Sequence, residues 1–362
     1  MNANYKPLDY FYETCEYEKF DRLSDERINE LIDKLLLVLP NNGHLYKYRS
    51  FKTDNFDLHL NSYKDGYLYL PTANTLNDKI DCSFNYKELR TSKEILEYIL
   101  ENKYRIHYIN LKATDNKKLK VNLNEKLDVL ASLHFYDDEV RAAKCLKDKA
   151  IPFLQKLQFV KQVKKEVDSY VCSEEFLSET IEKYDNLGKM MQETIKVFSF
   201  CESCEQDSMW AYYSSDNNGY CIEYDLNKIK KMDRNLKIKL IPIYKVIYDN
   251  QRDPIDPFNL YEVGIFDKTN HKKLIDVNKH ILKSFITKSL SWEHEKEWRL
   301  LSMDKEQVLY ADLIYGFIID EDELENEKAK MLIKLANDKN YVVKVRHLNK
   351  RTNTFEIKNL EQ

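Results

Sequence analysis

The order of the secondary-structure signals constrains the fold of this chain most strongly. Two strand-like segments, HLYKYRSF (44–51) and GYLYLP (66–71), precede a block of period-3.6 apolar stripes over about 86–196, and most other strand signals follow it. A long insertion adds little closure entropy, so strands on its two sides can still pair in one sheet. We therefore predict one α+β domain over residues 1–362, with a mixed or antiparallel β core interrupted by a helical insertion over 86–196.

The local patterns predict the elements around that block. SDER followed by INELIDKLLLVLP (24–40) predicts a helix that stops at Pro40, and Asn41-Asn42-Gly43 predicts a turn. A further helical stretch is expected over about 261–290. The predicted later strands are KVFSFCE, GYCIEYD, KIKLIPIYKVIYD, EWRLLSM, LIYGFIID and YVVKVRHL.

Composition narrows the class of protein. With only 6 glycines in 362 residues and neither spacing present, the chain lacks the glycine-rich phosphate loops of Rossmann and P-loop proteins. A net charge of −4 argues against a surface built entirely for nucleic acid. No apolar run approaches the length of a membrane span, and the N-terminus does not resemble a signal peptide. The seven scattered cysteines indicate reduced thiols, so we expect a cytoplasmic protein without a membrane partner.

The run from Trp292 to Arg299, WEHEKEWR, concentrates charge in eight residues. Alternation in a strand would put Glu293, Glu295 and Glu297 on one face, where like charges repel. Either that face is solvated or its carboxylates serve chemistry. A third interpretation is structural, because Arg299 lies two residues beyond Glu297 and is a natural ion-pair partner for it.

The strand-like segment HLYKYRS carries two cations. Strand alternation puts Lys47 and Arg49 on one face, a spacing that suits a phosphate or diphosphate. The alternative is a solvated edge strand that uses lysine to prevent edge-to-edge pairing.

Three other motifs favour structural roles. The CxxC formed by Cys201 and Cys204 has no second cysteine pair, so ordinary packing is the better interpretation than metal or redox chemistry. The segment 77–81, NDKID, is typical of a tight loop shaped by side-chain hydrogen bonds. Residues 208–225 indicate a short helix, a turn closed by Gly219 and a strand, with most aromatic rings in the core.

Taken together, these segments resemble a known family. LYKYRS, the NDxxD-like loop, SFCE…MWAYYSSDNNGYCIEYD and K…WEHEKEWRL resemble the bacterial domain of unknown function 2971, from about Leu45 to the strand LIYGFIID. Two positions depart from that family. Lys79 stands where its loop usually has proline, and Tyr212 stands where histidine usually follows Met-Trp-Ala.

The layout of that family is similar to the ADP-ribosyltransferase superfamily, which implies a related fold and NAD as the substrate. In that resemblance Arg49 matches the first-strand position, with Lys47 and Tyr48 beside it as further NAD-binding residues. Tyr212 or Tyr213 matches the central aromatic position. Glu295 and Glu297 match a catalytic Glu-x-Glu, and no metal is expected.

The resemblance implies ADP-ribosyl transfer from NAD, or NAD hydrolysis, by a bacterial effector such as a toxin or a phage-defence protein. The sequence leaves open the acceptor (protein, nucleic acid, small molecule or water) and the oligomeric state. One alternative is a non-catalytic module that binds a nucleotide or a partner in the same cleft. Another is a nuclease in which Asp78 and Asp81 join the glutamate run around a divalent cation.

Overall fold

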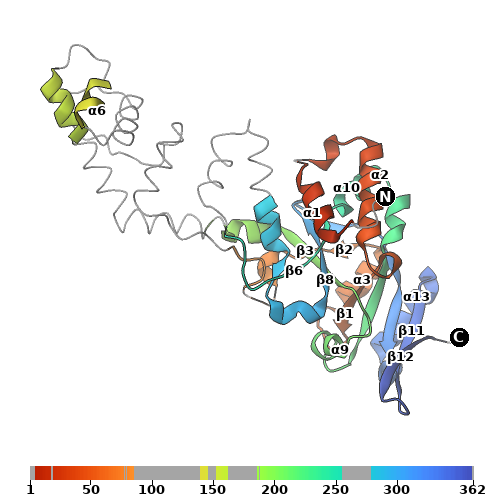
Figure 1. Cartoon of the computed structure of the whole chain (residues 1–362). Coiled ribbons are helices and arrows are strands. Elements are labelled where there is room, and N and C mark those ends of the chain that lie inside the picture. The colour runs from red at the N-terminus through yellow and green to blue at the C-terminus, as the bar shows by residue number, and fades with distance from the viewer. Residues whose placement is uncertain are drawn as a thin grey trace. The chain divides into compact units, whose positions relative to one another are not determined.

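The computed structural model describes part of the chain in detail. The described residues are 5–84 except 18, 77 and 79, then 139–145, 152–161, 186, 188–254 and 279–360. The chain divides into two compact units, of which the first comprises Met1–Phe84, Lys189–Asp253 and Leu274–Gln362 and the second Asn85–Gly188 and Pro254–Lys273. Within the second unit, α6 (Glu139–Cys145) is a described helix (Figure 1). Most of the predicted insertion lies outside the described residues, so the division into one domain with an insertion stays a prediction.

The first unit is built on a mixed sheet of eight strands. Their order is β12-β11-β10-β4-β1-β3-β8-β5, and β10 and β11 are parallel while the other neighbours are antiparallel. The strands are β1 (His44–Ser50), β3 (Lys196–Cys201), β4 (Gly219–Asp225), β5 (Ile243–Lys245), β8 (Glu297–Ser302), β10 (Ile314–Asp320), β11 (Val342–Asn349) and β12 (Thr354–Asn359). The strand that precedes the helical block, β1, thus lies between two strands that follow it. The predicted α+β class with a mixed sheet is confirmed.

Two short strand pairs accompany the large sheet. β2 (Leu68–Tyr69) pairs antiparallel with β9 (Val308–Leu309), and β6 (Ile247–Tyr248) pairs in parallel with β7 (Thr287–Lys288). The second pair matters for the site, because it holds the strand segment that ends at Lys288 next to the start of β8.

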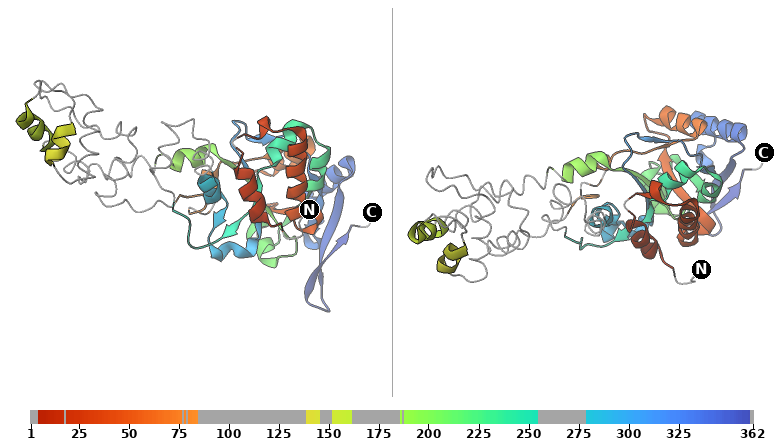
Figure 2. Two further views of the ribbon diagram at one scale, coloured as in Figure 1. Left: turned by 45° about the horizontal axis from the view of Figure 1, so that its top comes forward. Right: turned by 90° about the horizontal axis from the view of Figure 1, so that it is seen from above.

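Helices cover both faces of the large sheet. α3 (Phe56–Asp65) and α13 (Glu327–Lys339) lie side by side on one face, and α1 (Pro7–Cys15), α2 (Asp25–Val38) and α10 (Arg234–Leu240) lie on the other (Figure 2). α9 (Asp207–Tyr213) packs against β1. The 3-10 turns are η1 (Phe20–Arg22), η2 (Asn41–Gly43), η3 (Ala73–Thr75), η4 (Leu226–Lys231), η5 (Leu290–Glu295) and η6 (Glu321–Glu323). No helix among the described residues is long and apolar enough to cross a bilayer.

Local sequence explains most of these elements. The Ser24 side chain caps α2 by accepting a hydrogen bond from the Arg27 amide, and the helix ends before Pro40 as predicted. The predicted strand over 237–249 is wrong in its first part, because Asp233 caps α10 and draws KIKL into that helix. The sequence of β12 shows no strong apolar alternation, and this strand is not among those predicted from the sequence. It is held by antiparallel backbone pairing with β11.

Candidate functional site

An opening in the large sheet creates the site. β1 pairs with β4 along its whole length but meets β3 only at Tyr46 and Cys201. The start of β3 pairs instead with the segment around Thr72. Beyond Tyr46, the carbonyl of Ser199 is met by the Lys47 ammonium group, with an Nζ–O distance of 2.6 Å. The two strands therefore part at the C-terminal end of β1.

Because side chains alternate along a strand, residues from both faces of the sheet lie at this opening. Tyr46 pairs with Cys201, and Cys201 pairs with Glu297, so these three residues share one face. Lys47 and Arg49 lie on the other face, together as predicted. Glycine is needed at position 219 for the close approach of β4 to β1, because a Cβ there would lie 2.1 Å from the Arg49 carbonyl oxygen.

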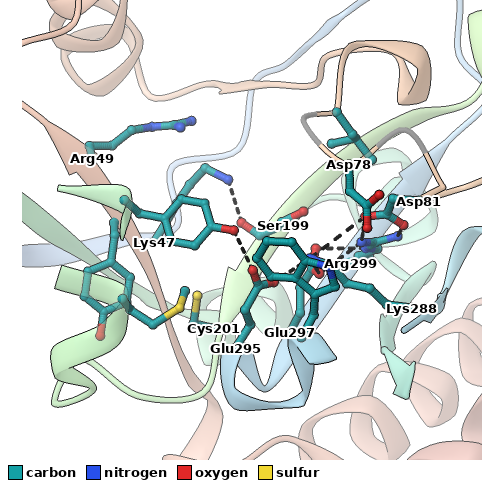
Figure 3. Close-up of a pocket in the computed structure, with 15 residues that line it drawn as sticks. Lys47, Arg49, Asp78, Asp81, Ser199, Cys201, Lys288, Glu295, Glu297 and Arg299 are labelled. Carbon is teal, nitrogen blue, oxygen red and sulfur yellow. Dashed lines mark hydrogen bonds and ion pairs between the residues drawn. The ribbon is translucent and has the colours of Figure 1, made fainter. Parts of the chain in front are cut away.

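A cavity of about 220 Å³ occupies the opening. Both faces and the loop after η3 contribute to its wall (Figure 3). The predicted site residues on the wall are Lys47, Tyr48, Arg49, Tyr213, Glu295 and Glu297. An arginine from an early strand and a carboxylate pair from a late segment therefore line the same cavity, despite the long stretch of chain between them.

The glutamate run does not form the strand that its alternation suggested. Leu290–Glu295 is the 3-10 turn η5, and Lys296 follows with φ 45° in the left-handed region. β8 begins only at Glu297. Glu293 is consequently exposed, whereas Glu295 and Glu297 turn inward and are 3% and 4% exposed. The predicted common face for three glutamates is wrong, because a turn and not a strand sets their directions.

Three further buried charged residues surround the two glutamates. We call Asp81, Lys288, Glu295, Glu297 and Arg299 the ion-pair cluster; each is less than a tenth exposed. Arg299 Nε donates to Glu297 Oε1 at 2.8 Å, and Arg299 Nη2 donates to Asp81 Oδ2 at 2.6 Å. Lys288 Nζ donates to Glu295 at 2.5 Å and to Glu297 at 3.2 Å. Three carboxylates thus face two cations, which leaves one negative charge in excess within the cluster.

The cluster keeps Glu297 ionised. Burial opposes ionisation of this carboxyl, but Arg299 and Lys288 outweigh burial and lower its pKa to about 2. Burial also opposes the charged form of Lys288, yet Glu297 and Glu295 raise its pKa. Both groups are therefore charged at neutral pH, and Glu297 is unsuited to donating a proton there.

The two glutamates differ in how many acceptor positions remain. A carboxylate offers about four such positions. Glu297 accepts two hydrogen bonds from Arg299, one from Lys288, and interacts with the Ser199 side chain. Glu295 accepts one from Lys288 and one from the Tyr213 hydroxyl, each at 2.5 Å. Glu297 is saturated by the protein, whereas Glu295 retains acceptor capacity.

The opposite side of the cavity carries the cation pair, by which we mean Lys47 and Arg49. Arg49 has no ion-pair partner within the described part of the chain, and its Nε is buried without a hydrogen bond. Lys47 likewise lacks a carboxylate partner there, and its Nζ lies 4.2 Å from the centre of the Phe198 ring. Figure 3 places Arg49 apart from the ion-pair cluster, with Lys47 between them.

The three predicted site tyrosines differ in their position relative to the cavity. Tyr213 touches both the cavity and Glu295, and burial followed by this hydrogen bond raises the pKa of its hydroxyl. Tyr48 reaches the wall, but its ring packs against Trp210 in the core and its hydroxyl donates to the Ser203 carbonyl. Tyr212 is 72% exposed and is not among the wall residues, so the structure does not bring it into the site.

Sequence reasoning missed three wall residues. Lys288 has no predicted role, and Asp81 is predicted to lie in a tight loop or, in the nuclease alternative, beside a divalent cation. Asp81 instead binds Arg299, while Asp78 shapes the loop through the Ile80 amide. Trp292 also lines the cavity, with Lys288 Nζ 4.9 Å from its ring centre. A lone lysine within the apolar segment FITKSL was the available signal for Lys288.

The cysteines of this region are structural. Cys201 is buried, Cys204 is partly buried, and both are free thiols, in agreement with the packing interpretation. Burial raises the pKa of the Cys201 thiol, which disfavours a reactive thiolate. No group of three potential metal ligands occurs among the residues that the structure describes.

The central part of the site carries a family match. Residues 209–300 match the family model described as protein of unknown function (DUF2971). This segment runs from α9 to β8 and contains Lys288, Glu295, Glu297 and Arg299, so the match supports the DUF2971 resemblance at the ion-pair cluster. No curated protein matches the chain, and no solved structure matches it. The resemblance to ADP-ribosyltransferases stays a prediction.

Proposed function

We propose that the cavity binds NAD and that the protein transfers its ADP-ribosyl group or hydrolyses its nicotinamide–ribose bond. The observation that carries the proposal is the meeting of Arg49 with the Glu295 and Glu297 pair on one cavity wall. Cleavage of that bond builds positive charge on the ribose, and a buried cluster with excess negative charge is suited to stabilise it.

The proposal gives the two glutamates different roles. Glu295 contacts the ribose, because its free acceptor positions can take hydrogen bonds from sugar hydroxyl groups. Glu297 positions the ion-pair cluster through Arg299 and Lys288 and supplies negative charge without contacting the sugar. Tyr213 orients Glu295 through its hydroxyl group.

The remaining parts of NAD are assigned by charge and shape. Arg49 takes the diphosphate, since a guanidinium without a protein carboxylate is free to bind a phosphate in a bidentate manner. The Trp292 ring provides a stacking surface for a planar ring at the cavity wall. A cavity of about 220 Å³ encloses the nicotinamide–ribose half, and the adenosine half extends outside it.

The test is NAD consumption by the purified protein, followed as nicotinamide release. Glu295→Gln is expected to lower the rate about 100- to 1000-fold, the usual effect of removing one electrostatic stabiliser. Glu293→Gln is the matched control, because Glu293 lies on the same turn but is exposed. Wild-type protein without turnover, or equal turnover by wild type and Glu295→Gln, would count against this reaction.

A second candidate is a module that binds a nucleotide without reacting. The saturation of Glu297 by Arg299 and Lys288 favours it, since a fully paired carboxylate is suited to holding a fold in place. This candidate predicts stabilisation without turnover. NAD or ADP-ribose at about 100 times its dissociation constant is expected to add about 2.7 kcal/mol to the free energy of unfolding. The absence of a thermal shift with either ligand contradicts it.

A further inference from the structure

Lys47 has surroundings that differ from those of an ordinary surface lysine. Its Nζ reaches the cavity, lies over the Phe198 ring and donates to one backbone carbonyl, that of Ser199. Within the described part of the chain no carboxylate lies at ion-pair distance from it. Lys47 is partly buried, and an ammonium group held in this way lacks the nearby carboxylate that favours the protonated form.

Arg49 adds an anion-binding group beside that amine. It lies two residues along the same face of β1, it lines the same cavity, and its Nε is buried without a hydrogen-bond partner. The Arg49 side chain interacts with the Tyr63 hydroxyl, but its Nε at the cavity has no protein partner and can donate to a ligand or to water. A phosphate or carboxylate group of a ligand is a suitable acceptor.

We infer that Lys47 is an amine nucleophile that binds a small aldehyde or ketone covalently, with an anionic group of that compound held by Arg49. The lone pair of Nζ attacks the carbonyl carbon, and the carbonyl oxygen takes up the displaced π electrons. Two protons from solvent convert that oxygen to water, which leaves as the nitrogen lone pair forms the C=N bond. Nζ releases one proton to solvent to give a protonated imine, or both to give a neutral one. The product is a protonated or neutral imine, and no oxidant or reductant is consumed. A cavity of about 220 Å³ is of the size that a phosphorylated compound of this kind needs.

The charge environment of Lys47 supports the chemistry. Burial, followed by the charge of Arg49, lowers the pKa of Lys47 to about 7. The titratable groups that face it are Arg49 on β1, His59 on α3, Cys201 on β3 and Glu297 on β8. Compared with an ordinary lysine of pKa near 10.4, the fraction of free amine at neutral pH is larger by about a thousandfold. Imine formation at neutral pH is then selective for Lys47.

The experiment uses pyridoxal 5′-phosphate as the probe, with borohydride reduction and mapping of the adduct by peptide mass spectrometry. With limiting probe at pH 7, we expect most of the reduced adduct on Lys47. Lys47→Met keeps the apolar stem and is expected to abolish this labelling. Lys245→Met, at a half-exposed lysine that pairs with Glu202, is the matched control and is expected to change nothing.

Two further experiments distinguish the role of the Lys47 amine from that of Arg49 as the anion-binding group. Arg49→Met is expected to raise the concentration of pyridoxal 5′-phosphate needed for half-labelling by about tenfold or more, the loss of one charge-assisted hydrogen bond. The same variant also removes a charge that lowers the pKa of Lys47, so labelling by pyridoxal, which has no phosphate, is expected to fall, but by less than labelling by pyridoxal 5′-phosphate. Labelling of wild type is expected to increase with pH around pH 7 and then level off.

Three results overturn the inference. They are adduct spread over many lysines of wild-type protein, labelling of Lys47 that rises only near pH 10, and equal effects of Arg49→Met on both probes. The mapping on wild-type protein decides the first of these even where a variant does not fold. None of the readouts uses NAD, so the inference can fail while the proposed NAD reaction stands, and the reverse.

Discussion

The two sides of the cavity treat buried charge in opposite ways. In the ion-pair cluster, Glu297 is matched by Arg299 and Lys288, and the protein fills the acceptor positions of this carboxylate, although not those of Glu295. In the cation pair, Arg49 and Lys47 have no carboxylate partner in the described part of the chain. Charges of the first kind hold the fold, because removing one partner strands the other in a low-dielectric site. Charges of the second kind remain available to a ligand.

The largest expected difference between the two sides is in stability. Arg299→Met leaves Asp81 and Glu297 buried without their guanidinium, so we expect it to lower the free energy of unfolding by about 3–5 kcal/mol. Arg49→Met strands no carboxylate and is expected to change it by about 1 kcal/mol or less. Urea titration of the two variants measures this difference. Equal losses would show that Arg49 also serves the fold.

On the acidic side, Glu297 is expected to make the free energy of unfolding depend on pH. The pKa of Glu297 is about 2 in the folded protein and near 4.3 in an unfolded chain, so the unfolded state takes up a proton first as pH falls. Its contribution is complete above about pH 4.3 and is lost as pH falls towards 2, by on the order of 3 kcal/mol. Denaturant titrations at several pH values check this. Glu297→Gln should reduce the slope in this window, and an unchanged slope would contradict the prediction.

The cationic side is expected to show a change of the same sign in a different pH window, for the opposite physical reason. The pKa of Lys47 is about 7 in the folded protein and near 10.4 in an unfolded chain, so between these values the unfolded state binds more protons. Stability therefore rises with pH from about 7 upward, as it does between about pH 2 and 4.3 for Glu297, but here because the unpaired charge of Lys47 is neutralised in the folded protein. Thermal melts of wild type and Lys47→Met between pH 7 and 9 measure it. Parallel curves for the two proteins rule out a shifted Lys47.

The smallest expected effect compares adjacent tyrosines. Tyr213→Phe removes the hydroxyl that donates to Glu295 and is expected to lower the rate of NAD consumption about tenfold, which corresponds to about 1.4 kcal/mol. Tyr212→Phe changes an exposed side chain outside the cavity and serves as the matched control, with no change expected. Equal rates for the two variants mean that the hydroxyl of Tyr213 does not orient Glu295 for the reaction.

Most strands of the first unit could be predicted from local patterns, but the directions of only some site residues could. Lys47 and Arg49 share a face because β1 is a regular strand, and a regular strand alternates. The same rule failed at Glu293 and Glu295, because the left-handed conformation at Lys296 and the turn η5 replaced the strand there. Periodicity describes regular backbone, and it gives no information on an irregular turn.

The sequence alone determined most of the strands of the first unit, which charged residues are concentrated, and that β1 presents two cations together. These properties depend on neighbours a few positions apart. Tertiary structure alone decided that Asp81 binds Arg299, that Lys288 joins Glu295 to Glu297, and that Tyr213 rather than Tyr212 faces the cavity. Neutralisation of buried charge depends on groups brought together from distant parts of the chain, and no local pattern encodes which groups will meet.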